Sequence, residues 1–149
     1  MKLVLASDHA AFELKGELVS WLKSQGYDVH DVGTHSSERC DYPDYARKCA
    51  EVVARDEEKK ILGILLCGSG IGASMAANRF SDIRAAVCLD EESAKLSRAH
   101  NDANILCMGS RLISIEKSKK VVKAWLSGTF EGGRHRGRVE KFSKWGEKL

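Results

Sequence analysis

Short apolar runs alternate along the chain with longer stretches in which apolar residues recur at helical spacing. The apolar runs do not alternate with polar positions, which is typical of parallel strands covered on both faces. They predict five strands, at Lys2–Ala6, Tyr27–Val32, Ile61–Cys67, Arg84–Leu89 and Ile105–Gly109.

The stretches between these strands predict helices that pack on the sheet. The apolar stripe that begins at Phe12 is followed by Gly26, and the stripe that begins at Ile115 is followed by Gly128, both usual stop signals. Pro43 precedes the stripe of the second helix, and its fixed φ favours a helix start. A last, basic helix over about Arg138–Lys148 has no strand after it, so we expect it to pack on a partner subunit.

Strands joined by helical crossovers predict an α/β fold, a doubly wound three-layer sandwich with a five-stranded parallel sheet. The length of 149 residues fits one domain spanning residues 1–149. Hydrophobic residues make up 43% and charged residues 30% of the chain, which is an ordinary globular composition. A net charge of +3 is too small an excess to suggest nucleic acid.

No apolar stretch approaches the roughly 20 residues of a membrane span, and the apolar run at the N-terminus meets a charge too early for a signal peptide. We therefore expect a cytoplasmic protein without a membrane partner. The five cysteines show no Cys-x-x-Cys spacing, which excludes zinc-ribbon and thioredoxin sites. Cys88 and Cys107 lie inside apolar runs and are predicted to be buried thiols.

Candidate chemistry gathers where the predicted strands end, the edge at which such sheets bind ligands. Asp8 and His9 follow the first strand, Cys67–Gly72 follows the third, and Arg111 follows the fifth. The glycines of the third segment let backbone N–H groups approach an anion, and a helix over about Gly72–Asn78 adds its positive end. A tight turn with glycines for packing alone is the alternative.

This glycine loop lacks the Gly-Lys-Ser/Thr ending of a Walker A loop and the spacing of a dinucleotide fingerprint. Its first residue, Cys67, stands at a predicted helix N-terminus, where a thiolate is stabilised and can act as base or nucleophile. For Asp8, the alternative to binding substrate hydroxyls is to cap the helix that begins near Ala11.

Two further groups of polar residues lie away from this edge. His100 and Asn101 precede the fifth strand, so they belong at the amino ends of the strands, opposite Cys67. If they are catalytic, a second subunit must bring them to the thiol; otherwise His100 merely interacts with a helix C-terminus. Arg134 and Arg138 follow a Gly-Gly turn and either clamp one phosphate or form a solvated basic tail.

These motifs, in this order, closely resemble ribose-5-phosphate isomerase type B, of the sugar-phosphate isomerase family that includes galactose-6-phosphate isomerase subunits. The resemblance covers nearly the whole chain, up to about its last ten residues. It is carried by Asp8-His9, Ser36-Ser37-Glu38-Arg39, Asp41-Tyr42-Pro43, Cys67-Gly68-Ser69-Gly70-Ile71-Gly72, Ala76-Ala77-Asn78-Arg79, Ile83-Arg84-Ala85, His100-Asn101-Asp102-Ala103-Asn104, Gly109-Ser110-Arg111 and Glu131-Gly132-Gly133-Arg134-His135.

The resemblance implies interconversion of D-ribose 5-phosphate and D-ribulose 5-phosphate through a cis-enediolate, in the non-oxidative branch of the pentose phosphate pathway. It also implies a Rossmann-like fold, no metal or other cofactor, and a homodimer or tetramer whose active site is shared between subunits. Two alternatives stay open: an isomerase of a six-carbon aldose 6-phosphate such as allose or galactose 6-phosphate, and a non-catalytic phosphate- or nucleotide-binding module.

The resemblance also assigns roles to individual residues. Cys67 matches the general base, and Ala73–Ala76 on the following helix offer no carboxylate that would replace it. His100 matches the acid that assists ring opening, with Asp8 on the sugar hydroxyls. Ser69 keeps the hydroxyl of the family's threonine. The sugar and enediolate are held by Gly68, Gly70, Ile71, Gly72 and Asn101, and the phosphate by His9, Arg111, Arg134 and Arg138.

Overall fold

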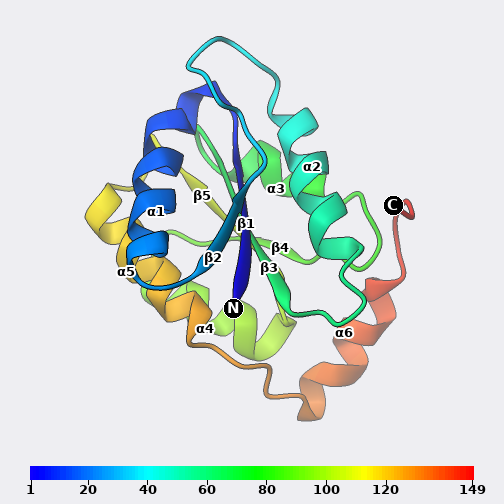
Figure 1. Cartoon of the computed structure of the whole chain (residues 1–149). Coiled ribbons are helices and arrows are strands. Elements are labelled where there is room, and N and C mark those ends of the chain that lie inside the picture. Colours follow the sequence, from blue (N-terminus) through cyan, green and yellow to red (C-terminus); the bar gives the residue numbers. More distant parts are fainter.

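A parallel five-stranded sheet forms the centre of the computed structural model, which describes residues 1–149 (Figure 1). The strands lie in the order β2-β1-β3-β5-β4. This confirms the predicted parallel sheet and its number of strands. The strands are β1 (Lys2–Ser7), β2 (Asp28–Asp31), β3 (Ile61–Cys67), β4 (Ala85–Val87) and β5 (Ile105–Gly109).

Helices cover both faces of the sheet, as the predicted three-layer sandwich requires. Apolar side chains of α1, α4 and α5 share a core with one face, and those of α2 and α3 share a core with the other. The helices are α1 (Phe12–Ser24), α2 (Tyr42–Ala54), α3 (Ile71–Ala77), α4 (Glu91–Asn101), α5 (Ile115–Leu126) and α6 (Arg136–Ser143), with short 3-10 turns at His9–Ala11 and Gly133–His135.

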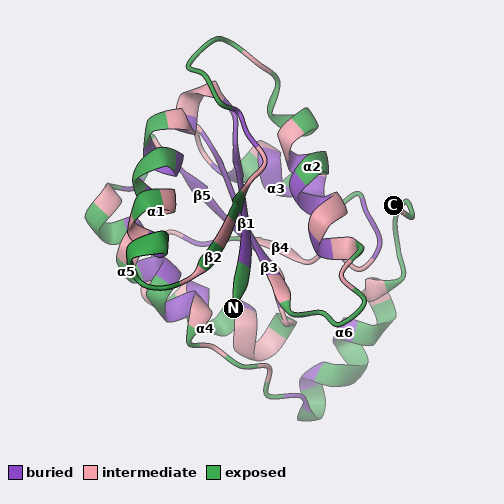
Figure 2. Ribbon diagram, in the orientation of Figure 1, coloured by how far each residue is buried: buried purple, intermediate pink, exposed green.

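The alternation of side chains along each central strand produces two separate cores. In β1, Leu3 and Leu5 contribute to the core under α1 and α5, whereas Val4 and Ala6 contribute to the core under α2. Trp125 of α5 is fully buried, and Figure 2 shows the central strands as the buried layer between half-exposed helices. A strand buried on both faces needs apolar residues at every position, which explains the unbroken apolar runs.

The predicted boundaries are accurate for the central strands and less so at the edges. Both edge strands, β2 and β4, are shorter than predicted. At β4, the side chain of Asn78 donates to the carbonyl of Ala85 and accepts from its N–H, both at 2.8 Å. This side chain takes the place of a neighbouring strand at that residue. Pro43 lies within the first turn of α2 rather than before it.

The last helix differs most from its prediction over Arg138–Lys148. It begins at Arg136 and ends at Ser143, because the chain turns back at Gly146, where φ is +106°. Glu147 then donates its N–H to the carbonyl of Arg79 at 2.8 Å, and its own carbonyl accepts from Ser81 at 2.8 Å. The last residues therefore pack on the chain that follows α3; packing of α6 on a partner subunit stays a prediction.

None of the helices combines the length and the apolar character needed to cross a membrane.

A buried ion pair joins α1 to the edge strand β2. The Lys15 ammonium, 2% exposed, binds the carboxylate of Asp31, which is 26% exposed. The second oxygen of Asp31 accepts the N–H of Gly33 at 2.9 Å. Gly33 and Thr34 in turn hydrogen-bond with Ser7, the last residue of β1. The pair therefore supports the loop beside the carboxyl end of β1.

We expect Lys15→Met to lower the free energy of unfolding by about 1–3 kcal/mol, because it leaves a half-buried carboxylate without its cation. Urea denaturation measures this loss. The double variant Lys15→Met/Asp31→Asn should recover part of it, since no unpaired charge remains. A loss below about 0.5 kcal/mol in the single variant, the range of ordinary surface changes, would contradict the role given to the pair.

Candidate active site

The glycine loop after β3 presents backbone amides around a buried thiol. Cys67 ends β3 with 4% of its surface exposed, and the N–H of Gly70 donates to its Sγ at 3.1 Å. Gly70 has φ +79° and immediately precedes α3. The thiol therefore lies at the start of α3, in direct contact with the backbone of the glycine loop.

The loop lies in direct main-chain contact with the end of β5. A Cβ added to Gly109 would lie 2.6 Å from the carbonyl oxygen of Ser69, and one added to Gly70 would lie 2.9 Å from the carbonyl carbon of Met108. Glycine at these positions therefore allows the two backbones to approach. Tyr42 of α2 covers the other side, because a Cβ on Gly72 would lie 2.7 Å from its ring.

Asp8 and His9 lie in the turn between β1 and α1, at the same edge. The Asp8 carboxylate accepts the N–H of Ala10 at 3.0 Å, so the capping role considered from the sequence is real. His9 is half-buried, and its Nδ1 lies 3.2 Å from the backbone nitrogen and 3.1 Å from the backbone oxygen of Cys40. These contacts hold one nitrogen of the imidazole against the protein and leave Nε2 for a ligand.

Arg111 joins this edge from the end of β5. Its N–H donates to the carbonyl of Gly68 at 3.0 Å, and its guanidinium carbon lies 3.4 Å from where a Cβ on Gly68 would be. The Ser110 hydroxyl donates to the carbonyl of Ala10 at 2.7 Å and ties the end of β5 to the turn after Asp8 and His9. The structure thus brings Asp8, His9, the Cys67–Gly72 loop and Arg111 together at the carboxyl ends of the strands.

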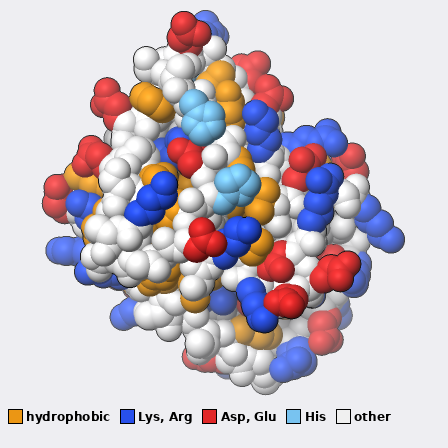
Figure 3. Space-filling model, in the orientation of Figure 1, with side chains coloured by type: hydrophobic (Ala, Val, Ile, Leu, Met, Phe, Trp, Pro, Cys, Tyr) orange, Lys and Arg blue, Asp and Glu red, His pale blue; other side chains and the backbone are white.

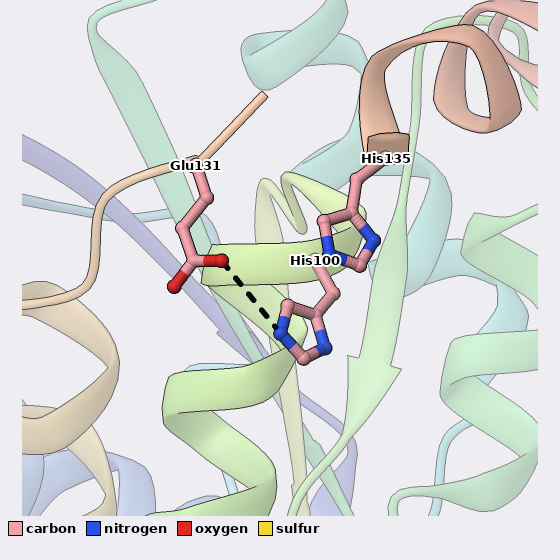
Figure 4. Close-up of side chains that lie close together, drawn as sticks. All are labelled: His100, Glu131 and His135. Atoms are coloured by element: carbon pink, nitrogen blue, oxygen red, sulfur yellow. Dashed lines mark ion pairs between the residues drawn. The ribbon is translucent and has the colours of Figure 1, made fainter. Parts of the chain in front are cut away.

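The remaining predicted site residues form a second group at the opposite edge of the sheet. His100 and Asn101 end α4, and the ring of His100 stacks on that of His135 with centroids 4.2 Å apart and planes inclined by 11° (Figure 4). Glu131 Oε2 lies 3.9 Å from His100 Nε2. Arg134 donates from Nε to His135 Nε2 at 3.4 Å, and Arg138 follows on α6.

Two members of this group, Glu131 and His135, were not identified as site residues from the sequence. Their signal in the sequence is the Glu-Gly-Gly-Arg-His run, in which only Arg134 is predicted to bind substrate. Burial lowers the pKa of His135, and the neighbouring His100, Arg134 and Arg138 shift it in the same direction, whereas Glu131 opposes them. Positive side chains therefore outnumber negative ones around His135.

The ligand atoms of His100, Glu131 and His135 lie within 4.8 Å of one another, close enough to suggest a metal site. Two features oppose this use. The two rings are stacked, so the lone pairs in their planes do not converge on one point. An arginine side chain also occupies His135 Nε2. The surroundings favour an anion over a divalent cation.

The group around Cys67 and the group around His100 cannot meet within one chain. Gly63 pairs with Ile105 at one end of β3 and β5, and Cys67 pairs with Gly109 at the other. Four residue-to-residue steps along the strand separate these ends by about 13 Å. His100 lies further back, before the start of β5. The structure therefore confirms the opposite placement expected from the sequence. On the face of the molecule drawn in Figure 3, positive and negative side chains are mixed, and the basic side chains form no continuous stripe.

Known proteins match this chain over most of its length. The family described as Ribose/Galactose Isomerase matches residues 3–142. Ribose-5-phosphate isomerase B of Escherichia coli K12 is 51% identical over 139 residues, 93% of this chain and 92% of that protein. The solved ribose 5-phosphate isomerase of Thermotoga maritima is 48% identical, with a TM-score of 0.91 over 95% of this chain and 97% of that one. The ribose-5-phosphate isomerase B of Mycoplasma genitalium, solved with bound ribulose-5-phosphate, has 38% identity and a TM-score of 0.92 over 95% and 93%.

We expect Gly109→Ala to destabilise the protein by about 1–3 kcal/mol, because its methyl group would push the Ser69 backbone out of place. Gly16→Ala is the matched control, since a Cβ there meets nothing within 4 Å. In the middle of α1 that change should stabilise by about 0.5–1 kcal/mol. Urea denaturation of both variants checks the pair. Equal effects of the two changes would contradict the close approach of the loop and β5.

Proposed function

The chain belongs to the ribose/galactose isomerase family, and from that premise we propose that it is the isomerase that interconverts D-ribose 5-phosphate and D-ribulose 5-phosphate. The observation that carries this proposal is the 51% identity, over 93% of the chain, to a protein named for that activity. The relatives named for ribose 5-phosphate favour a five-carbon substrate over allose or galactose 6-phosphate. A catalytic thiol beside the loop amides is not needed by a module that only binds phosphate.

Cys67 is the proposed general base. Moving the carbonyl from C1 to C2 requires a base that takes the C2 proton of the open-chain aldose and returns a proton to C1. The electron pair of the broken C–H bond then forms the C1–C2 double bond of a cis-enediolate with negative charge on O1, and the proton of the C2 hydroxyl passes to O1 before C1 is protonated. The N–H groups of the Gly68–Gly72 loop and the Ser69 hydroxyl are the donors positioned to stabilise that oxygen. The contact between the Gly70 N–H and Sγ supports this role, because it fixes the sulfur beside the loop amides.

His100 is the proposed acid for the preceding step, in which the furanose ring opens. It donates a proton to the ring oxygen while the hydroxyl at C1 loses one, which yields the aldehyde. Asp8 accepts hydrogen bonds from sugar hydroxyls and Asn101 helps to hold the chain. His9, Arg111, Arg134 and Arg138 bind the phosphate, whose remote binding energy can orient the reacting carbons.

These assignments require a homodimer, because Cys67 and His100 lie at opposite edges of one sheet. We propose that each site combines the Cys67 loop, Asp8, His9 and Arg111 of one subunit with His100, Asn101, Arg134 and Arg138 of its partner. Ile71 and Met75 of α3 support this arrangement, since they are 49% and 66% exposed next to the loop. Apolar side chains at such a position favour contact with another protein surface.

We further propose a single catalytic domain over residues 1–149, active in the cytoplasm. All five cysteines are free thiols, which suits a reducing compartment.

Cys67→Ala should reduce turnover of ribose 5-phosphate by roughly 10²–10⁴-fold, the usual contribution of a general base. Formation of the ketose from ribose 5-phosphate, measured with EDTA present, gives the rate. Cys88→Ala is the control, because Cys88 is equally buried but lies in the core under α4 and α5. Normal turnover in Cys67→Ala would overturn the assigned base. If the wild-type protein converts only six-carbon aldose phosphates, the substrate is corrected and the reaction class stands.

Mixing two variants of strongly reduced turnover tests the shared site. Cys67→Ala and His100→Asn each disable both sites of their own dimer, but a hybrid dimer keeps one intact site. Random pairing after co-refolding at equal amounts should restore about one quarter of the wild-type activity. Each variant refolded alone serves as the control. No recovery from a mixture that contains hybrid dimers would contradict a site divided between subunits.

A further inference from the structure

Two nearly buried arginines converge on one carboxylate at the end of α4. Arg84 Nη2 lies 3.0 Å from Asp102 Oδ2, and Arg98 Nη1 lies 3.3 Å from Asp102 Oδ1. The arginine side chains are only 10% and 15% exposed, and Asp102 is 34% exposed. Both oxygens of this carboxylate are therefore bound to cations held away from water.

The same arginines also bind the backbone around Asp102. Arg84 Nε donates to the carbonyl of Asp102 at 2.7 Å, and Arg98 Nη1 donates to the carbonyl of Ala103 at 2.6 Å. Asn104 completes the connection: its Oδ1 accepts the N–H of Arg84 at 2.8 Å. The turn between α4 and β5 is thus held by both its side chains and its carbonyls.

Asp102 is also the residue at which α4 ends. It adopts a left-handed conformation with φ 47°, and its N–H bonds the carbonyl of Arg98. Glycine is the residue usually favoured there, because a Cβ is disfavoured in that region. Aspartate tolerates this conformation better than most residues, and here its carboxylate also reaches both arginines.

His100 lies two residues before this clamp, on the same last turn of the helix. The segment that carries Glu131 attaches to that turn as well, through its N–H to the carbonyl of Ala99 at 3.0 Å. The position of His100 relative to Glu131 and to the stacked His135 therefore depends on where α4 ends. A shift of that end would move the imidazole away from a ring oxygen held on another subunit.

We propose that Asp102 is a positioning residue for the isomerase: its carboxylate, held by Arg84 and Arg98, fixes the end of α4 so that His100 meets the sugar ring. This inference rests on the proposed role of His100 as the ring-opening acid. Burial lowers the pKa of Arg98, and the charge of Asp102 opposes that shift, which agrees with an arginine side chain that is only 15% exposed.

The test uses two rates that differ in their need for ring opening. Turnover of ribose 5-phosphate requires ring opening, because this aldose is bound as a closed ring. Uptake of solvent deuterium at C1 of ribulose 5-phosphate does not, because this ketose is open-chain and exchange needs only the base and the enediolate. Both rates are measured for the full-length dimer by NMR, with urea denaturation to record stability.

We expect Asp102→Gly and Asp102→Asn to lower turnover of ribose 5-phosphate by roughly 10- to 100-fold, the effect of a misplacement of about 1 Å, and to retain deuterium exchange. His100→Asn should likewise lower turnover and retain deuterium exchange. Asp102→Gly is the sharper variant, since glycine relieves the left-handed backbone and keeps the turn. Normal turnover in Asp102→Gly, or an equal fall of both rates, would overturn the positioning role.

Asp90→Ala is the matched control on the other end of the same helix. Asp90 caps α4 by accepting the N–H of Ser93 at 2.7 Å. Its loss should weaken the helix without lowering turnover relative to deuterium exchange. If Asp90→Ala lowered turnover relative to exchange as much as Asp102→Gly does, the proposal would also be overturned. A wild-type protein that shows neither turnover nor exchange would instead overturn the proposed function.

Discussion

The parallel direction of all five strands is the constraint on which the rest of the structure depends. Each helix returns the chain across the sheet, so turns that follow strands gather at one edge and turns that precede strands gather at the other. Cys67, Asp8, His9 and Arg111 share the first edge because each follows a strand. His100 and Asn101 precede β5, and no change of side-chain conformation can bring them to the carboxyl ends of the strands. The division of the candidate site is therefore a property of the topology.

The two groups also differ in their electrostatic character. Around Cys67 the main donors are backbone amides, which are fixed in place by glycines packed against β5. Around His100 the donors are long or aromatic side chains held by stacking and by arginines. The first arrangement suits an oxygen whose charge develops during reaction, because its dipoles need no movement. The arginines of the second group, like His9 and Arg111 beside the loop, suit a phosphate dianion that carries its charge throughout.

Much of this arrangement can be predicted from the sequence where burial dominates. The strands β3 and β5 begin and end as predicted, because residues covered on both faces leave an unbroken apolar run. The edge strands were predicted too long, since Tyr27 and Leu89 continue the apolar pattern beyond the last ladder hydrogen bonds. The end of α6 was missed because the decisive contact, Gly146 against the backbone of Arg79, joins segments far apart in the sequence. Contacts of that kind, and the stacking of His100 on His135, leave no periodic trace.

The opposite placement of Cys67 and His100 has a consequence for how activity scales with the amount of protein. If one site needs residues from two chains, a lone folded subunit contains every required group and yet no complete site. The rate per chain then follows the fraction of chains that are assembled, and it falls on dilution below the dissociation constant of the pair. Isomerisation is in that sense a property of the assembled pair of subunits. A ligand that bridges both subunits also strengthens their association by mass action.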